Sequence, residues 1–251
     1  MRMSAKTFHW PTGGHGTSLP AGQVHVYVWD LDVLQAADWE ILNEEEAERA
    51  RRFVFPRDRD RFVRARATLR RVLAGYSGIA AEQICFRNGE YGKPRIATAP
   101  HTGPIEFNLS HSADIAVAAV CRNLTLGIDV ERVRPIEPEI AEDHFSPHEL
   151  LALRGLDEKE WLQGFYRCWT GKEALLKGEG LGLNLPLDAF DVEVHPQRPA
   201  ALLAWRAAAA FAQGWRLFAL HPVPETIGTL AVRDPAGELS AANIRCFSLP
   251  A

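Results

Sequence analysis

The sequence predicts an α/β protein made of two similar halves that face each other across a cleft. With 251 residues, of which 47% are hydrophobic and 24% charged, the chain can bury the core of one large domain or two small ones. Segments with the alternation typical of strands are interspersed with segments of helical periodicity. The order of these segments in residues 124–251 parallels the order in residues 23–123, although no sequence repeat is visible.

The first half follows a leader, residues 1–22, which has no apolar signal-peptide core and is predicted to be flexible because Gly, Pro and Ser interrupt it. Valines alternate with other residues over 24–28, which indicates a strand. Asn43 is placed to cap a helix whose first turn holds three glutamates. A longer amphipathic helix is predicted from Asp58 to Tyr76, with Gly75 and Gly78 marking its end. Short strands are expected within 84–96, 104–109 and 114–121.

The second half repeats this order of elements. A strand is predicted at 124–131, a short helix at 146–154 and a long helix at 158–178. Later strands are predicted at 189–194, 201–207, 214–221 and 228–233. Two halves with this arrangement would form a cleft between them, which is a common place for a ligand.

Composition narrows the class of protein. No run of residues approaches the roughly 18 to 20 apolar positions that a membrane span needs, so we expect a soluble protein without a membrane partner. The four cysteines are widely spaced and include no C-x-x-C pair, which disfavours a zinc or redox motif and favours the reducing cytoplasm.

An uneven charge distribution stands out against the net charge of −4. Residues 49–71 contain ten arginines and only two aspartates, Asp58 and Asp60. Such a segment should attract an anion such as a nucleotide phosphate, an acidic protein helix or nucleic acid. The alternative is a solvated helix face, because arginine is a good helix former and pairs with aspartate at helical spacing.

The segment LGIDVERVRP places Asp129 and Glu131 two residues apart on a predicted strand, so both carboxylates project from one face. Burying such a pair is costly unless a cation neutralises it, and hard oxygen ligands suit magnesium or calcium. Magnesium completes its shell with water and substrate phosphates, so this interpretation implies a phosphate-bearing substrate. An exposed strand face is the simpler alternative.

The segment WTGKEALLKGEGLGL places Glu173 and Lys177 four residues apart on one helix face. A surface ion pair would explain this spacing. Trp169, one turn earlier, can pack that face against the core, and the glycines that follow permit close backbone approach. A lysine beside a carboxylate that faces a metal is suited to polarising a phosphoryl group.

Two further segments are weaker on their own. In FNLSHS, Ser110 and His111 are adjacent strand residues that point to opposite faces, which argues against a nucleophile and base and favours ligand contacts or a structural role. In EYGKP, Gly92 and Pro94 shape a tight turn that is expected to leave Lys93 extended as a point charge.

Together the four segments resemble the Sfp-type 4′-phosphopantetheinyl transferases. EYGKP, FNLSHS, GIDVE and WTGKEALLKGEGLGL follow one another in the order and spacing of that family, and the resemblance covers roughly residues 24–190. The WTxKEA form is similar to the branch that has Trp and Ala at these positions. The resemblance implies a monomeric pseudo-dimer of two α/β halves, each with a mainly antiparallel sheet and a long helix, with coenzyme A and magnesium bound between the halves.

The resemblance also implies roles for individual residues. Asp129, Glu131 and Glu173 are the implied magnesium ligands, and Lys177 is the lysine that contacts the pyrophosphate. The remaining coenzyme A contacts implied by the family are Ser110 and His111 at the adenosine phosphates, Tyr91, Gly92, Lys93 and Pro94 around the adenine and its 3′-phosphate, and Arg49 near that phosphate.

The expected reaction transfers phosphopantetheine from coenzyme A to a serine of an apo acyl, peptidyl or aryl carrier protein. Glu173 is the first candidate for the base that takes the serine proton, directly or through a metal-bound water. Glu149, in FSPHELLAL, matches a family glutamate near the metal site and is the second, although an ordinary first-turn glutamate explains it equally well. Carriers of fatty acid, polyketide and nonribosomal peptide synthesis all qualify, and manganese could replace magnesium.

Two other classes of function stay open on the sequence. The arginine-rich helix could bind nucleic acid, but the pI of about 6.1 and the lack of a known nucleic-acid module argue against such a partner. A catalytically inactive protein that binds coenzyme A or a carrier is also conceivable, although it would be free to lose Asp129, Glu131, Glu173 or Lys177.

Overall fold

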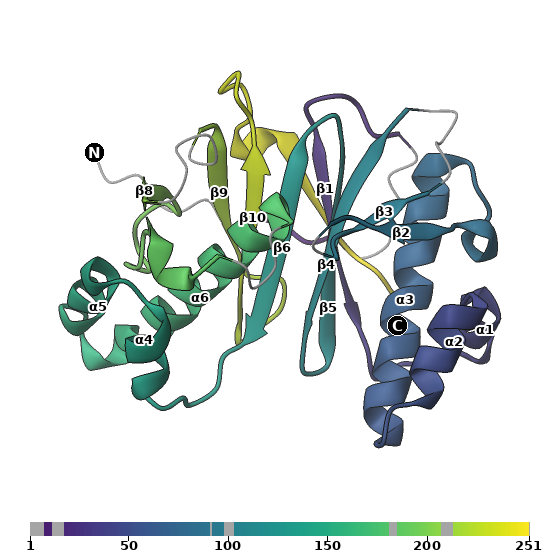
Figure 1. The fold of residues 1–251 in the computed structure, drawn as a ribbon, viewed down its shortest axis with the longest axis horizontal. Coiled ribbons are helices and arrows are strands. Elements are labelled where there is room, and N and C mark those ends of the chain that lie inside the picture. The colour runs from purple at the N-terminus through teal and green to yellow at the C-terminus, as the bar shows by residue number, and fades with distance from the viewer. Residues whose placement is uncertain are drawn as a thin grey trace.

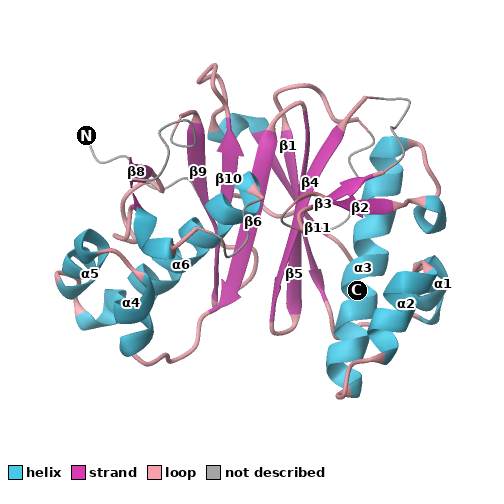
Figure 2. Ribbon diagram, in the orientation of Figure 1, coloured by secondary structure: helices cyan, strands magenta, loops and turns pink. Residues whose placement is uncertain are grey.

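The computed structural model describes residues 8–11, 18–90, 92–97, 103–180, 185–206 and 213–250. Tyr91 and the leader segments 1–7 and 12–17 therefore lie outside the described residues. The described chain forms two α/β halves side by side, with sheets in the centre and helices on the two outer flanks (Figure 1). Colouring by secondary structure makes this four-layer arrangement plain (Figure 2).

Both halves follow one order of elements. The first half contains β1 (Val24–Asp30), α1 (Ala36–Ile41), α2 (Glu44–Arg51), α3 (Pro56–Ser77), β2 (Phe86–Asn88), β3 (Pro94–Ile96), β4 (Ile105–Ser112) and β5 (Ile115–Arg122). The second contains β6 (Thr125–Arg132), α4 (Glu139–His144), α5 (Pro147–Arg154), α6 (Glu158–Glu179), β7 (Phe190–Val192), β8 (Leu202–Trp205), β9 (Trp215–Leu220) and β10 (Thr226–Arg233). The predicted α/β class with two similar halves is confirmed.

The main sheets have the orders β11–β1–β5–β4 and β6–β10–β9, and β2–β3 and β7–β8 form two small ribbons. All described strand pairs are antiparallel except that of β1 with β11 (Ile244–Ser248), which is parallel. This last strand was missed by the sequence patterns, and it joins the first half although it follows the second. The expected division of the chain into 23–123 and 124–251 therefore does not describe its final strand.

Three apolar cores hold the layers together. One lies between α3 and the first sheet, and another between α6 and the second sheet. The third lies between the two sheets and is built from alternate residues of β1 and β6: Val24, Val26 and Val28 with Leu126, Ile128 and Val130. Because side chains alternate along a strand, the intervening residues of β6 face α6.

The two long helices begin and end close to the predicted positions. Asn43 caps α2 as predicted by accepting the backbone N–H of Glu46 at 2.9 Å. Both α3 and α6 have 22 residues and end at glycines in the left-handed conformation, Gly78 with φ 70° and Gly180 with φ 71°. Gly75, expected at the end of α3, lies inside the helix, and the short helices α1 and α4 were not predicted.

The arginines of residues 49–71 pair largely with carboxylates of the same half. Arg61 bonds to Asp32 at 2.6 Å, Arg71 to Asp38 at 2.5 Å, and Arg70 to Glu46 at 2.7 Å. Arg64 also pairs with Asp38, and Arg66 with Glu46. The positive charge of residues 49–71, which was expected to attract an anion, is therefore largely neutralised by carboxylates from outside this segment.

No described helix is both long enough and apolar enough to cross a membrane. All four cysteines are free thiols, and only the side chain of Cys85 is exposed.

Candidate active site

The site begins with two glycines that let α6 lie directly against β6. A Cβ atom on Gly127 would overlap the carbonyl oxygen of Ala174 and the backbone nitrogen of Gly178. Gly178 is confined on its other side by the indole ring of Trp215, which a Cβ atom would also overlap. The glycines of GIDVE and KGEG therefore allow a backbone approach that brings the polar residues of β6 and α6 together.

Asp129 and Glu131 on β6, with Glu173 and Lys177 on α6, form the polar group at this contact. Lys177 Nζ donates to Asp129 Oδ1 at 2.5 Å, and the Asp129 side chain is nearly fully buried. Asp129 Oδ2 is buried with no hydrogen-bond partner among the described residues. One carboxylate oxygen is therefore neutralised by the lysine, and the other is a buried acceptor that lacks a donor or cation.

The other two carboxylates, Glu131 and Glu173, have raised pKa values. Burial raises the pKa of Glu131, and the charge of Asp129 raises it further, although a hydrogen bond from Ser112 opposes the shift. Burial also raises the pKa of Glu173, with Asp129 raising and Lys177 lowering it. An added cation would relieve the desolvation and repulsion that both glutamates experience.

Strand β4 of the first half meets this group through side chains instead of backbone groups. Asn108 Oδ1 accepts the N–H of Ile128 at 2.9 Å, and Ser112 Oγ accepts the N–H of Arg132 at 3.1 Å. Ser110 Oγ donates to Asp129 Oδ1 at 2.7 Å and accepts from Lys177 Nζ at 3.0 Å. Alternate β4 residues thus join the two halves at the carboxylates, and we call this junction the β4–β6 seam.

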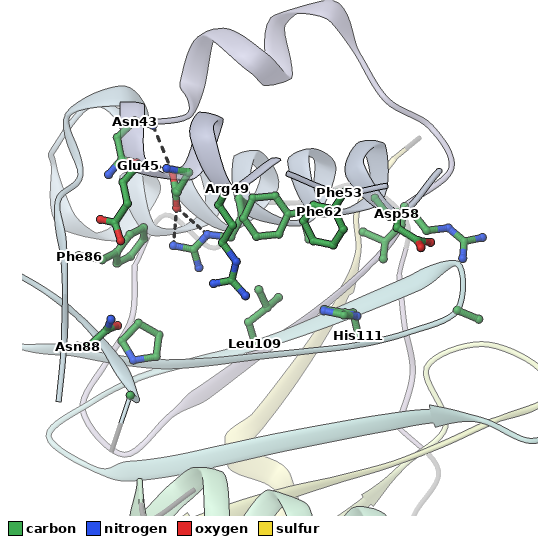
Figure 3. Close-up of a pocket in the computed structure, with 18 residues that line it drawn as sticks. Asn43, Glu45, Arg49, Phe53, Asp58, Phe62, Phe86, Asn88, Leu109 and His111 are labelled. Carbon is green, nitrogen blue, oxygen red and sulfur yellow. Dashed lines mark hydrogen bonds and ion pairs between the residues drawn. The ribbon is translucent and has the colours of Figure 1, made fainter. Parts of the chain in front are cut away.

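The opposite face of β4 lines a cavity of about 780 Å³ between that strand and helices α2 and α3. Leu109 and His111 project into it from β4, while Arg49, Phe53 and Phe62 line the helical side (Figure 3). Gly92 and Pro94 also line this cavity. As expected from strand alternation, Ser110 and His111 point to opposite faces, one to the seam and one to the cavity.

The cavity is lined by aromatic side chains and by charges of both signs, with Glu45, Glu46 and Asp58 as well as Arg49, Arg61 and Arg66. Arg49 lies over the Phe62 ring, with 5.3 Å between the guanidinium carbon and the ring centroid, and its guanidinium points into the space above β4 (Figure 3). Within the described part of the chain, no carboxylate lies within ion-pair distance of Arg49. Partial burial lowers the pKa of His111, and the charges of Lys177 and Arg49 lower it further.

Lys93 occupies a different position from the one expected. Its ammonium is buried and donates to the carbonyl oxygens of Leu126 on β6 at 2.8 Å and Gly178 on α6 at 3.0 Å. Burial lowers its pKa, which the nearby Glu106 opposes. The predicted extended point charge is wrong, because the unpaired carbonyls of the second half bind the ammonium and make Lys93 a link between the halves.

Glu149 has both carboxylate oxygens engaged elsewhere. Oε1 accepts the N–H of Val192 at 2.8 Å, and Oε2 accepts the N–H of Ser146 at 3.0 Å and pairs with Lys172 at 2.8 Å. Its helix, α5, lies at the outer end of the second half, whereas β6 lies at the centre of the molecule (Figure 1). The structure does not bring Glu149 into the carboxylate group at the seam.

The carboxylates fit a hard divalent cation by their chemistry. Among the described residues, no three His, Cys, Asp or Glu side chains are already gathered at metal-binding distances. The unpartnered buried oxygen of Asp129, together with the raised pKa values of Glu131 and Glu173, nevertheless describes an oxygen-rich group that lacks positive charge. The residues present are therefore compatible with the magnesium that the family resemblance implies.

Comparison with known proteins agrees with this geometry. The family model described as "4′-phosphopantetheinyl transferase superfamily" matches residues 125–226, and the one described as "4′-phosphopantetheinyl transferase, N-terminal" matches residues 32–123. The 4′-phosphopantetheinyl transferase HetI of Nostoc sp. is 33% identical over 220 residues, which cover 86% of this chain and 90% of HetI. The chain belongs to the 4′-phosphopantetheinyl transferase family.

Other relatives of this phosphopantetheinyl transferase match a shorter region. The 4′-phosphopantetheinyl transferase Sfp of Bacillus subtilis is 36% identical over 154 residues, which cover 61% of this chain and 67% of Sfp. The L-aminoadipate-semialdehyde dehydrogenase-phosphopantetheinyl transferase of Pongo abelii is 32% identical over 166 residues, which cover 62% of this chain and 53% of that protein. The suspected family membership is thereby confirmed.

The predicted site residues of this transferase fall into separate places. Asp129, Glu131, Glu173, Lys177 and Ser110 meet at the seam, and Arg49, Gly92, Pro94 and His111 line the cavity. Lys93 and Glu149 belong to neither group, and Tyr91 lies outside the described residues.

Sequence reasoning missed Asn108 and Ser112, which bond to β6, and the aromatic residues that line the cavity. The polar alternation N-x-S-x-S in β4 was the available signal, because it places three hydrogen-bonding side chains on one face of the strand.

Proposed function

We propose that this phosphopantetheinyl transferase moves the 4′-phosphopantetheine group of coenzyme A onto a serine of an apo carrier protein. The observation that carries the proposal is the β4–β6 seam, where Asp129, Glu173 and Lys177 meet beside a cavity lined by aromatic side chains and by Arg49. A pyrophosphate needs both positive contacts and a place for its nucleoside, and these two neighbouring features supply them.

The nucleotide end of coenzyme A is assigned to the cavity. A volume of about 780 Å³ is within the usual range for small-molecule sites. Phe53, Phe62 and Phe86 offer apolar faces to the adenine, and Arg49 and His111 offer donors to phosphate oxygens. Because Ser110 and His111 are adjacent on β4, a ligand that reaches from the cavity past this strand arrives at Lys177 and the carboxylates.

Asp129, Glu131 and Glu173 are the proposed ligands of a magnesium ion, and manganese would suit the same oxygen set. The ion would supply neutralisation of the negative charge on the pyrophosphate. Lys177 provides a second positive charge at the same place, with its ammonium held between Asp129 and Ser110 until a phosphate oxygen takes over one of these contacts.

In the transfer, the hydroxyl oxygen of the carrier serine forms a bond to the β-phosphorus of coenzyme A. The bond from that phosphorus to the bridging pyrophosphate oxygen breaks, and adenosine 3′,5′-bisphosphate leaves. Glu173, one helical turn from Lys177 on α6 and beside the carboxylates of β6, is the proposed acceptor of the serine proton, directly or through a water molecule. Glu149, the alternative base, is disfavoured because both of its oxygens already accept hydrogen bonds.

The proposed partners are acyl, peptidyl or aryl carrier proteins, in the cytoplasm, with the transferase acting as a monomer. Carriers of fatty acid, polyketide or nonribosomal peptide synthesis present the same serine chemistry. Docking of an acidic carrier should weaken as salt rises.

Incubation with coenzyme A, magnesium and each of several apo carriers tests the proposal. A gain of one phosphopantetheine in the carrier mass, together with release of adenosine 3′,5′-bisphosphate, is the expected result. Omission of the metal should stop the transfer, and ranking the carriers by kcat/KM should identify the preferred class. Binding of coenzyme A without a mass shift on any carrier would refute the proposal.

A further inference from the structure

Each half contains a buried cation that joins its long helix to the cap of a neighbouring helix. In the first half the cation is Arg70 on α3, whose side chain is fully buried. Its Nε donates to Glu46 Oε2 at 2.7 Å, and Glu46 is the third residue of α2 and reciprocates the cap made by Asn43. The Arg70 Nη1 atom donates to the carbonyl oxygen of Ile84 at 2.7 Å, and Arg70 lies over the Phe86 ring at 5.1 Å from its centroid.

In the second half the cation is Lys172 on α6, which is also fully buried. Its Nζ pairs with Glu149 at 2.8 Å, and Glu149 is the third residue of α5 and reciprocates the cap made by Ser146. The same Nζ donates to the carbonyl oxygen of Phe190 at 2.6 Å and lies over that ring at 4.5 Å from its centroid.

The two groups occupy equivalent positions in the repeated plan. Helices α3 and α6 have the same length and both end at a left-handed glycine, so Arg70 and Lys172 lie eight residues before Gly78 and Gly180. Helices α2 and α5 each have eight residues, and both glutamates occupy the third position. Phe86 and Phe190 each begin the first strand of the small ribbon that follows the long helix.

From this equivalence we infer that Glu149 and Lys172 form a positioning pair, the counterpart of Glu46 and Arg70, and that Glu149 does not take the serine proton. The first half contains the pair Glu46 and Arg70 but has no counterpart of the carboxylate cluster at the seam. A function shared by both pairs must therefore concern the fold.

The function that both contact sets support is fixing the rotation of the long helix. Lys172 directly precedes Glu173, and successive helix residues point about 100° apart. Holding Lys172 against β7 therefore orients Glu173 and Lys177 toward β6. Loss of one charge of such a buried pair leaves the other unpaired, which is far more costly than loss of both.

The variant Glu149→Gln tests this role. Because it leaves the Lys172 ammonium buried without a carboxylate, we expect the Tm to fall on the order of 10 °C. We expect kcat/KM of the folded variant to fall by no more than about tenfold, with the acid limb of its pH profile unchanged. A base would behave differently, since its removal costs roughly 100-fold or more and abolishes that limb.

The variant Glu149→Gln/Lys172→Met separates the two roles most sharply. Removing the unpaired charge should restore much of the Tm and of the transfer rate relative to Glu149→Gln, whereas no change at Lys172 can replace a missing base. If Glu149→Gln does not fold, the double variant still decides, because a folded double variant that lacks transfer overturns the inference. A double variant less stable than both single variants would also overturn it.

The matched control is Glu46→Gln with Glu46→Gln/Arg70→Met, for which only the Tm is compared. We expect a similar fall but a smaller recovery than in the second half, because Arg66 also pairs with Glu46 and stays unpaired in the double variant. A Tm unchanged by either glutamate substitution would contradict the positioning role. The inference rests on the proposed transfer only for its rate measurements, so a wild-type protein that modifies no carrier would refute the transfer while the Tm comparison still tests the pair.

Discussion

The two halves share one order of elements, but their first strands, β1 and β6, differ in what covers one strand edge. The edge of β1 is covered by the backbone of β11 in a parallel pair, whereas the edge of β6 is met by the side chains of Asn108, Ser110 and Ser112. A backbone ladder closes an edge completely. An edge met by side chains instead leaves space beside the strand. Of the two edges, only that of β6 lies next to the cluster of Asp129, Glu131 and Glu173.

Strand registers identify which residues of the first half correspond to the site. Tyr27 and Trp29 pair with the fourth and second residues of β5, as Asp129 and Glu131 pair with those of β10. By the same register, Leu220 of β9 takes the place of Ser110. The helix equivalence places Arg71 and Gly75 where α6 has Glu173 and Lys177. The two halves thus have equivalent backbone positions, but only the second half carries acidic and basic site residues at these positions.

The largest difference in activity should appear when Asp129 of β6 and its equivalent in β1, Tyr27, are substituted. We expect Asp129→Asn to lower kcat/KM by more than ~10³-fold, because it removes a charge needed to hold the cation and Lys177. The equivalent substitution in the first half, Tyr27→Phe, should lower stability by about 1 kcal/mol and change transfer by less than about twofold. Steady-state kinetics and thermal unfolding measure both. Equal losses of transfer would show that the two halves do not differ as described.

The second test concerns the close contact of α6 with β6. We expect Gly127→Ala to destabilise the protein by about 3 kcal/mol and to reduce transfer, because the added methyl group would overlap backbone atoms of α6. Gly75→Ala in α3 should instead stabilise it by up to about 1 kcal/mol, since that glycine is helical with open space around it. Denaturant unfolding of both variants distinguishes these signs, and a harmless Gly127→Ala would mean that the contact is not needed.

The third test uses His25, which stands in β1 where β6 has Gly127. Burial, together with a smaller contribution from the charge of Arg245, lowers the pKa of His25 to about 4. Since the unfolded chain then binds more protons between about pH 6.5 and pH 4, stability should fall as pH decreases through this window, by up to about 3 kcal/mol. His25→Gln should flatten that part of the curve of unfolding free energy against pH, and an unchanged slope would contradict the assignment.

The smallest expected effect is at the cavity. Arg49 is the sixth residue of α2, and the sixth residue of α5 is Ala152, so Arg49→Ala makes the first half resemble the second at this place. We expect the KM for coenzyme A to rise about tenfold to thirtyfold with little change in kcat, since one charge-assisted hydrogen bond is lost. Arg51→Ala, an exposed neighbour on the same helix, is the control and should leave KM unchanged.

Local patterns predicted the parts of the fold that local physics determines. The valine alternation of β1, the Asn43 cap and the spans of α3 and α6 were read from neighbouring residues and agree with the structure to within about two residues. Strand β11 was missed because its partner β1 lies far away in sequence. The carboxylate partners of the arginines were missed for the same reason, since Asp32, Asp38 and Glu46 lie outside or before the helix that they neutralise.

The candidate site was predictable where a motif contains its own spacing. Asp129 with Glu131, and Glu173 with Lys177, were identified on single elements, and the family resemblance joined the two elements before any contact was known. The position of Lys93 could not be predicted, because its partners are backbone carbonyls of Leu126 and Gly178, and every residue has such a group. Side chains that bind the backbone of a distant segment leave no mark in a sequence pattern.

The pairing of β1 with β11 also bears on how this protein is made. Val24 is partnered with Ile244, 220 residues later in the chain. At synthesis rates of roughly 5 to 20 residues per second, the edge of β1 stays uncovered on the ribosome for on the order of 10 to 40 seconds. During that interval the first half exposes a strand edge that could pair with another nascent chain. The edge of β1 is protected from such pairing only once β11, the last described strand, has been synthesised.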